Sequence, residues 1–285
     1  MERMKSKIIN RLCSGALITL GLFMAVSCVD IPKEGSLAPD INYRNRKQQA
    51  ISGLAQSIGD FQVSTSTLPL YFEIVNITEA EGRDVSALRQ EIPVIRYTKP
   101  VVGDETEDEL KLKSDTAQVP AVTINQHTGR VEILEGNNIL AGEYHFDIQV
   151  TNSSGTRVLK DALVIEFAEY ELKSWSGDMA KAPEIERVGD APNQILFVGY
   201  LDGEPLHGNR IDFTESRASG FKGTFVDDTQ QGEIWNVGFP VKESTTYCNW
   251  KITTDDGGIE TSTYENAGFN FVLGRQGSYV IRLYK

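Results

Sequence analysis

The residues with the most specific chemistry stand near the amino terminus, where a cysteine follows a short run of small residues. The first eleven residues include four basic side chains and one acid, and residues 12–29 carry no charge. This uncharged stretch closes with the order Ala25-Val26-Ser27-Cys28. A basic start, a short apolar run and small residues before a cut are typical of an export signal. The sequence therefore predicts a signal peptide over residues 1–27, with the thiol of Cys28 next to the cut.

Cys28 in this setting resembles the cysteine of a bacterial lipobox, which is acylated and becomes the mature amino terminus. The one departure is Ala25, at a position where Leu is commoner. Each buried CH₂ contributes about 0.8 kcal/mol, so two or three acyl chains hold a protein firmly on a membrane. We expect Cys28 to be lipidated and the membrane to be a partner through that lipid. Two alternatives stay open: secretion with Cys28 free, and an uncleaved helix, since about 18 uncharged residues is the lower limit for a span.

The composition argues against nucleic acid as a partner. The chain has 28 basic and 40 acidic residues, and without residues 1–27 the net charge is −15. Phosphate backbones repel such a protein. After removal of the signal and acylation of Cys28, Cys248 alone remains, so no intramolecular disulfide can form. The fold must be stabilised by its buried core.

No catalytic or metal-binding pattern stands out. Motifs such as Cys-x-x-Cys, His-Glu-x-x-His, Gly-x-Ser-x-Gly and the P-loop are absent from the sequence. The three histidines, His127, His145 and His207, fall in a turn, on the polar face of a strand and in a loop. Carboxylate pairs are abundant, but no spacing selects one as a glycosidase pair. We expect no enzyme activity, no catalytic residue, no cofactor and no metal.

The remaining pattern is that of an all-β chain. Residues 28–50 are polar and are interpreted as a flexible tether after the acylated cysteine. Residues 104–114 are a charged run that favours a solvated helix, because its acids come first and its lysines last. Between Tyr144 and Val150 apolar and polar residues alternate strictly, which indicates a half-buried strand. Short strands with turns between them predict a β-sandwich over residues 51–168.

Part of this first domain resembles cadherin-like and related immunoglobulin-like domains. The resemblance is carried by Val122-Thr123-Ile124, Thr128-Gly129, Gly142 to Ile148, Thr151-Asn152 and Gly155. It implies a sandwich fold. Cadherin modules bind calcium through acidic motifs at their junctions, whereas this chain has Asn152 and no following Asp-Arg-Glu, so an acidic calcium-dependent adhesion module is the least favoured interpretation.

The carboxyl-terminal part predicts a second β-domain. Residues 169–193 contain glycines and prolines and are interpreted as a linker, and residues 194–285 as a sandwich or jelly roll. The layout also resembles an uncharacterised lipoprotein family of Bacteroidetes, through the start Cys28-Val29-Asp30, the stretch Leu68 to Asn76 and the turn Val150 to Ser153. In architecture it is similar to outer-membrane accessory lipoproteins of the starch-utilisation type. That likeness implies a lipid-anchored protein of the outer membrane, with an immunoglobulin-like spacer and a sugar-binding module.

Candidate ligand residues follow from what a sugar requires, a flat exposed ring beside hydrogen-bonding groups. In the stretch from Tyr247 to Thr253, Trp250 shares a face with Cys248 and Ile252 and is predicted to be core. Tyr247 then points the other way with Asn249. Trp235 is in phase with Val237 and is also assigned to the core. The candidate ligand-binding residues are Trp175, Tyr247, Asn249 and Asp202.

The leading hypothesis is therefore a non-enzymatic, membrane-anchored lipoprotein that binds glycan or assists a polysaccharide-uptake system. The alternative is a structural, adhesion or protein-interaction subunit of an outer-membrane complex, with a membrane transporter as partner. An exposed β-edge or apolar patch would favour the alternative.

Overall fold

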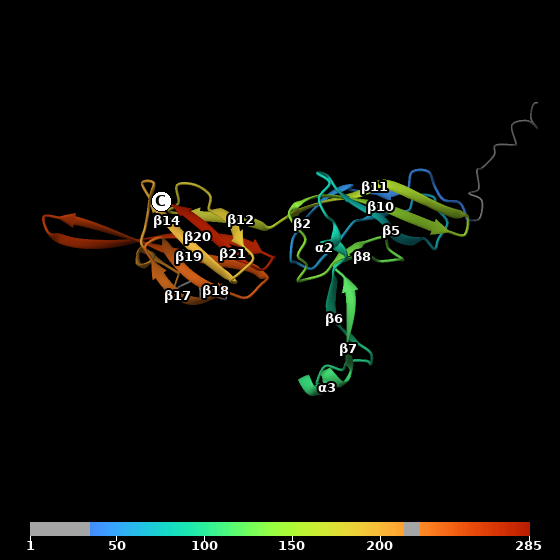
Figure 1. The fold of residues 1–285 in the computed structure, drawn as a ribbon, viewed down its shortest axis with the longest axis horizontal. Coiled ribbons are helices and arrows are strands. Elements are labelled where there is room, and N and C mark those ends of the chain that lie inside the picture. Colours follow the sequence, from blue (N-terminus) through green and yellow to red (C-terminus); the bar gives the residue numbers. More distant parts are fainter. Residues whose placement is uncertain (1–34, 214–222) are drawn as a thin grey trace, which may run out of the picture.

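The computed structural model describes residues 35–213 and 223–285, so Cys28 and the predicted signal peptide lie outside the described residues. The described chain is all-β, as the sequence predicts, and its sheets stack into sandwiches (Figure 1). Its buried apolar side chains gather in two clusters, one from residues 38–167 and one from residues 179–283.

The amino-terminal half has a main sheet of order β2-β11-β10-β5, in which β2 pairs with β11 in parallel and the other pairs are antiparallel. Its strands are β2 (Lys47–Ile51), β5 (Tyr71–Glu79), β10 (Gly142–Asn152) and β11 (Gly155–Ala168). Two small sheets, β3-β9-β8 and β1-β4, accompany it. Their strands are β1 (Asn42–Tyr43), β3 (Gln56–Ile58), β4 (Phe61–Gln62), β8 (Val122–Ile124) and β9 (Val131–Ile133). Helix α2 (Ser86–Arg89) buries Leu88 in the same cluster.

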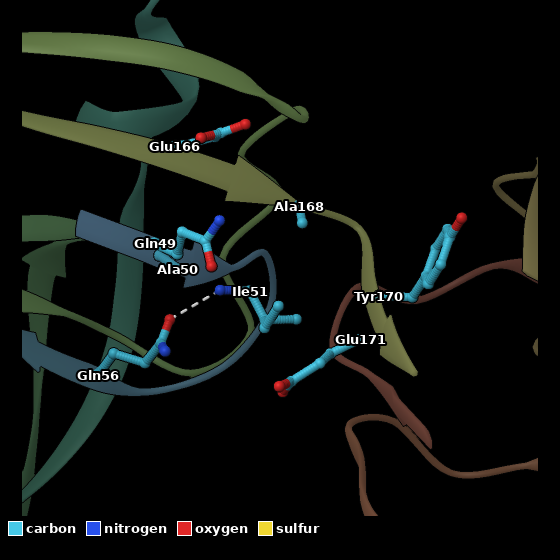
Figure 2. A pocket seen from close by; sticks show the side chains of 8 residues that line it. All are labelled: Gln49, Ala50, Ile51, Gln56, Glu166, Ala168, Tyr170 and Glu171. Carbon is cyan, nitrogen blue, oxygen red and sulfur yellow. Dashed lines mark hydrogen bonds between the residues drawn. The ribbon is translucent and has the colours of Figure 1, made fainter. Parts of the chain in front are cut away.

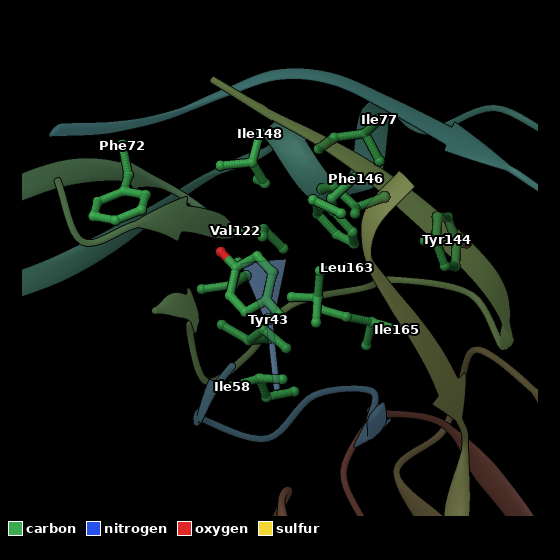
Figure 3. Close-up of a cluster of buried hydrophobic side chains, with 14 of the residues drawn as sticks. Tyr43, Ile58, Phe72, Ile77, Val122, Tyr144, Phe146, Ile148, Leu163 and Ile165 are labelled. Atoms are coloured by element: carbon green, nitrogen blue, oxygen red, sulfur yellow. The ribbon is translucent and has the colours of Figure 1, made fainter. Parts of the chain in front are cut away.

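The alternation predicted for β10 is confirmed on its apolar side. Tyr144, Phe146, Ile148 and Val150 are all buried in the first cluster. Figure 3 shows the first three of them among the core side chains. Asp147, expected on the wet side, is also buried. A β-bulge falls beside it, and the carboxylate accepts hydrogen bonds from the Lys160 ammonium at 2.6 Å and from the backbone N–H of Asp161 at 2.9 Å. A buried charge is tolerated there because it is paired and hydrogen-bonded.

A two-stranded arm projects from this body (Figure 1). It consists of β6 (Glu91–Tyr97), β7 (Ser114–Pro120) and the helix α3 (Glu107–Leu112) between them. The predicted solvated helix is confirmed, although it is shorter than residues 104–114, and none of its residues is buried. It begins with a capping box in which the hydroxyl of Thr106 accepts from the Glu109 N–H and the Glu109 carboxylate accepts from the Thr106 N–H.

The carboxyl-terminal half stacks two larger sheets over the second cluster. One has the order β12-β20-β19-β16, and the other β13-β21-β14-β18-β17 with β15 paired to β14. The first sheet consists of β12 (Tyr170–Gly177), β16 (Ile211–Asp212), β19 (Val241–Asp256) and β20 (Ile259–Leu273). The second consists of β13 (Glu184–Gly189), β14 (Gln194–Leu201), β15 (Glu204–Pro205), β17 (Gly223–Thr229), β18 (Gly232–Val237) and β21 (Ser278–Tyr284). A short 3₁₀ helix, η1 (Gly208–Arg210), precedes β16.

Two segments differ from the sequence interpretation. Residues 35–50, taken as part of a flexible tether, fold onto the first core, where Ile41, Tyr43 and Ala50 are buried. Residues 169–193, taken as a linker, contain strands β12 and β13. Composition misleads in both places because short strands at a sheet edge need only a few apolar residues, and the prolines of these segments lie outside the strands.

Candidate functional site

The outer face of the β12-β20-β19-β16 sheet carries the candidate site. Alternate residues of a strand point to opposite faces. On β20, Ala267, Phe269 and Phe271 are buried in the second core, so they mark the inner face. Asn266, Gly268, Asn270 and Val272 therefore lie on the outer face.

Tyr247 lies against Gly268 on this outer face. Tyr247 pairs with Gly268 across β19 and β20, and Ser176 of β12 pairs with Gly268 from the other side. A Cβ built on Gly268 would lie 3.5 Å from the Tyr247 Cδ1 and Cε1 atoms and 3.4 Å from the Ser176 Oγ. The missing side chain thus leaves space that the tyrosine ring covers, while 41% of Tyr247 stays exposed.

Polar side chains occupy the neighbouring outer-face positions. On one side, Asn249 pairs with Asn266 of β20 and with Asp212 of β16. On the other side, Asn270 pairs with Ser174 of β12. Amides and hydroxyls both donate and accept hydrogen bonds. An exposed flat ring flanked by such groups can stack on the C–H face of a sugar while the hydroxyls of the sugar pair with the amides.

One end of this face meets a hollow at the edge of the sheet. Lys251 and Tyr264, a cross-strand pair, line it together with Asp212. Its volume is about 300 Å³, and Asp228 and Glu233 of the opposite sheet lie on its far side. We call it the edge hollow.

A second hollow of about 420 Å³ lies where β11 passes into β12 (Figure 2). Its walls combine the Gln49 amide and the Glu166 carboxylate of the first body with Tyr170 and Glu171 of β12. The neighbouring Gln56 side chain is held by the backbone, since its Oε1 accepts from the Ile51 N–H at 2.8 Å. We call this the junction hollow. Tyr170 also borders a further hollow of about 600 Å³, which is lined by Gly142 and Glu143 of β10 and by Glu166 and Phe167 of β11.

The core assignments made from strand phase are confirmed. Trp250, Cys248 and Trp235 are fully buried, whereas Tyr247 is exposed. Burial raises the pKa of the Cys248 thiol well above its usual value, because the thiolate would lose its solvation. Cys248 therefore stays a protonated core residue.

The structure brings Tyr247 and Asn249 together, but it separates them from the other two candidates. Trp175 is 43% exposed, yet it pairs with Phe269 and so belongs to the inner side of the sheet at its edge. Asp202 occupies the tight turn between β14 and β15 with φ of 51°, in the other sheet. Its left-handed backbone explains an Asp-Gly pair at that turn without any ligand.

Sequence reasoning missed Tyr264, Asn266, Gly268 and Ser176. The signal was present, because Tyr264, Asn266, Gly268 and Asn270 alternate with the residues that become core. Ser176 could be assigned to the site only if β12 was known to be a strand of this sheet, and the composition of residues 169–193 does not predict that strand.

Among the residues that the structure describes, no group of three or more His, Cys, Asp or Glu side chains is arranged to hold a metal ion. Within residues 35–213 and 223–285, no helix has the length and apolar character needed to cross a bilayer.

Comparison with known proteins gives one structural similarity. No protein-family model matches the sequence, and no curated protein matches it. The structure is similar to that of a SusE-like surface located polysaccharide binding protein from the Bacteroides thetaiotaomicron heparin utilisation locus, with a TM-score of 0.30 and 10% sequence identity. The match covers 79% of this chain and 24% of the other, so the chain spans about a quarter of that protein's length.

Proposed function

We propose that this protein is a non-enzymatic, lipid-anchored accessory protein of the cell envelope that binds a glycan on the outer face of the β12-β20-β19-β16 sheet. The observation that supports glycan binding is the Tyr247 ring over Gly268. The ring lies against a glycine and is 41% exposed, with Asn249, Asn266 and Ser176 around it. A ring in the core could not offer this surface, and an isolated ring would lack the hydrogen-bonding groups.

The anchor and the placement belong to the same proposal. A lipid on Cys28 would attach the chain to the outer membrane, the first β-body would act as a spacer, and the second would present the glycan-binding face to the surroundings. The role fits polysaccharide capture for an uptake system better than catalysis, since no catalytic pattern occurs in the sequence.

Calorimetric titration and affinity electrophoresis against a panel of polysaccharides test the proposal. At least one polysaccharide should bind, and Tyr247→Ala should weaken its binding by about fivefold, because stacking on one aromatic ring contributes on the order of 1 kcal/mol. Tyr71→Ala is the matched control, because Tyr71 is equally exposed but lies on the first body. No heat and no retention with every polysaccharide would refute glycan binding.

The projecting arm favours a second candidate function, docking to another protein. Ile95, Tyr97 and Leu112 are more than half exposed on the arm, Leu112 by 79%. Exposed apolar groups on a projecting element are typical of protein contacts. Under this alternative the chain is an interaction subunit of an outer-membrane complex. It would co-purify with a membrane transporter, and replacing residues 92–119 by a short turn would end that association without altering glycan binding.

A further inference from the structure

The outer face runs from the edge hollow towards the junction hollow. Its rows follow from the strand pairing. They begin at Lys251–Tyr264, which lines the edge hollow, and they end at Glu171, which pairs with the buried Val272 and lines the junction hollow. Between these ends lie the rows of Asn249–Asn266, Tyr247–Gly268–Ser176 and Asn270–Ser174. We call these five rows the outer strip.

The outer strip is longer than one sugar needs. Tyr264 and Val272 are eight residues apart on β20, which at about 3.4 Å per residue in an antiparallel sheet is about 27 Å. A second exposed tyrosine, Tyr264, stands at one end and Tyr170 borders the hollow at the other. A ligand confined to Tyr247 would leave both tyrosines and both hollows unused.

The middle of the outer strip carries no charge. Its three inner rows are formed by asparagine, serine, tyrosine and glycine side chains at the paired positions named above. Carboxylates predominate at the two ends. In the edge hollow Asp212, Asp228 and Glu233 accompany the cation of Lys251, and Glu166 and Glu171 line the junction hollow, within a chain of net charge −12. A polyanion would therefore meet repulsion at both ends and gain no compensating cation in the middle.

We infer that the ligand is an uncharged polysaccharide whose chain lies along the outer strip from the edge hollow to the junction hollow. The inference rests on the proposed glycan-binding function. It adds that the glycan is uncharged and that it is long enough to fill the outer strip. The protein then binds internal segments of a polymer, with Tyr247 as the central platform, and the two hollows contribute only when the chain is long enough to reach them.

A length series tests this inference. Amylopectin, laminarin, xylan and mannan serve as neutral probes, and heparin and polygalacturonate as anionic ones. For a neutral polymer that binds, its oligosaccharides of two to ten units are titrated in turn. Affinity should rise at least tenfold from the disaccharide to the octasaccharide, whereas the anionic polymers should not bind.

Variants at the two ends separate this inference from the proposed function. Tyr264→Ala and Glu171→Ala should each weaken binding of the longest oligosaccharide severalfold and leave binding of the trisaccharide unchanged. Val188→Ala, an exposed change on the other sheet, is the control. If Tyr247→Ala abolishes binding but length and end variants have no effect, glycan binding stands and the extended mode is wrong. Preferred binding of heparin refutes the charge class, and no binding of any polymer refutes both proposals.

Discussion

Gly53 and Gly274 touch backbone to backbone where the two bodies meet. A Cβ on Gly53 would overlap the Gly274 carbonyl, and one on Gly274 would overlap the carbonyl oxygen of Ser52. Two ion pairs flank this contact, Lys242 with Glu135 and Arg275 with Glu169. The glycines therefore allow the two bodies to approach closely at this point.

We predict that Gly274→Ala separates the two bodies at this point. The added methyl group has only backbone to displace, and overpacking of this kind costs about 1–3 kcal/mol. Small-angle scattering should show a changed interbody arrangement, and urea unfolding should show a lower midpoint. Gly103→Ala is the matched control, because no atom lies within 4 Å of its Cβ position. Equal scattering curves for Gly274→Ala and the parent protein would contradict the prediction.

Trp250 and Tyr247 should respond oppositely to truncation, although they are three residues apart on β19. Trp250 is fully buried in the second core, and removal of such a side chain costs about 3–5 kcal/mol. Trp250→Ala should therefore lower the thermal midpoint strongly. Tyr247→Ala should leave the midpoint nearly unchanged and reduce glycan affinity. Reversal of these two outcomes, measured by thermal unfolding and by titration, would show that the strand phase is wrong.

The size of the residue at position 268 should determine whether the Tyr247 ring lies flat against the sheet and binds glycan. Gly268 has room for one methyl group at ordinary contact distance, 3.4 to 3.5 Å from its neighbours. Gly268→Ala should therefore keep both fold and glycan affinity. Gly268→Leu should lift the tyrosine ring from the sheet and weaken binding about as much as Tyr247→Ala does. If Gly268→Leu binds the glycan as tightly as the parent protein does, the contact of the Tyr247 ring with position 268 does not contribute to binding.

The all-β class and the inward positions of Trp235 and Trp250 could be predicted from the sequence, because apolar and polar residues alternate along the strands that contain them. The partners of each strand could not be predicted. Ser176 reaches the site only because β12 pairs with β20, more than ninety residues away in the chain. Trp175 and Asp202 were chosen for residue type, and pairing places one on the inner side and the other in a turn. The face of a sheet on which a side chain lies can thus be predicted from its own strand. Which residues of four strands come together on that face cannot, because it depends on how the strands pair.

Glu79 should make the stability of the first body depend on acid. Its side chain is almost fully covered, and a hydrogen bond from the Arg83 guanidinium at 2.6 Å, helped by the N–H groups of Glu81 and Arg83, lowers the pKa of the carboxyl to about 2. The ionised form is favoured in the folded state, so the stabilisation is complete above the usual value of 4.5 and is lost as the pH falls towards 2.

Urea unfolding of Glu79→Gln at several pH values checks this dependence. The variant should be less stable than the parent protein at pH 7, and the difference should shrink between pH 4.5 and pH 2. Glu81→Gln, which changes an exposed partner of the same arginine, should have little effect at any pH. A constant difference across that range would rule out Glu79 as the titrating group.

Cys28 should decide where the protein resides. If its thiol is acylated, labelled palmitate is incorporated and the protein sediments with the cell envelope, because several acyl chains hold a protein firmly on a bilayer. Cys28→Ser should lose the label and release the protein into the soluble fraction, while Cys248→Ser should keep both the label and the envelope association, since Cys248 is buried in the second core. Sedimentation of Cys28→Ser with the envelope would favour an uncleaved helix. A soluble parent protein without label would favour plain secretion, and glycan capture would then occur away from the membrane.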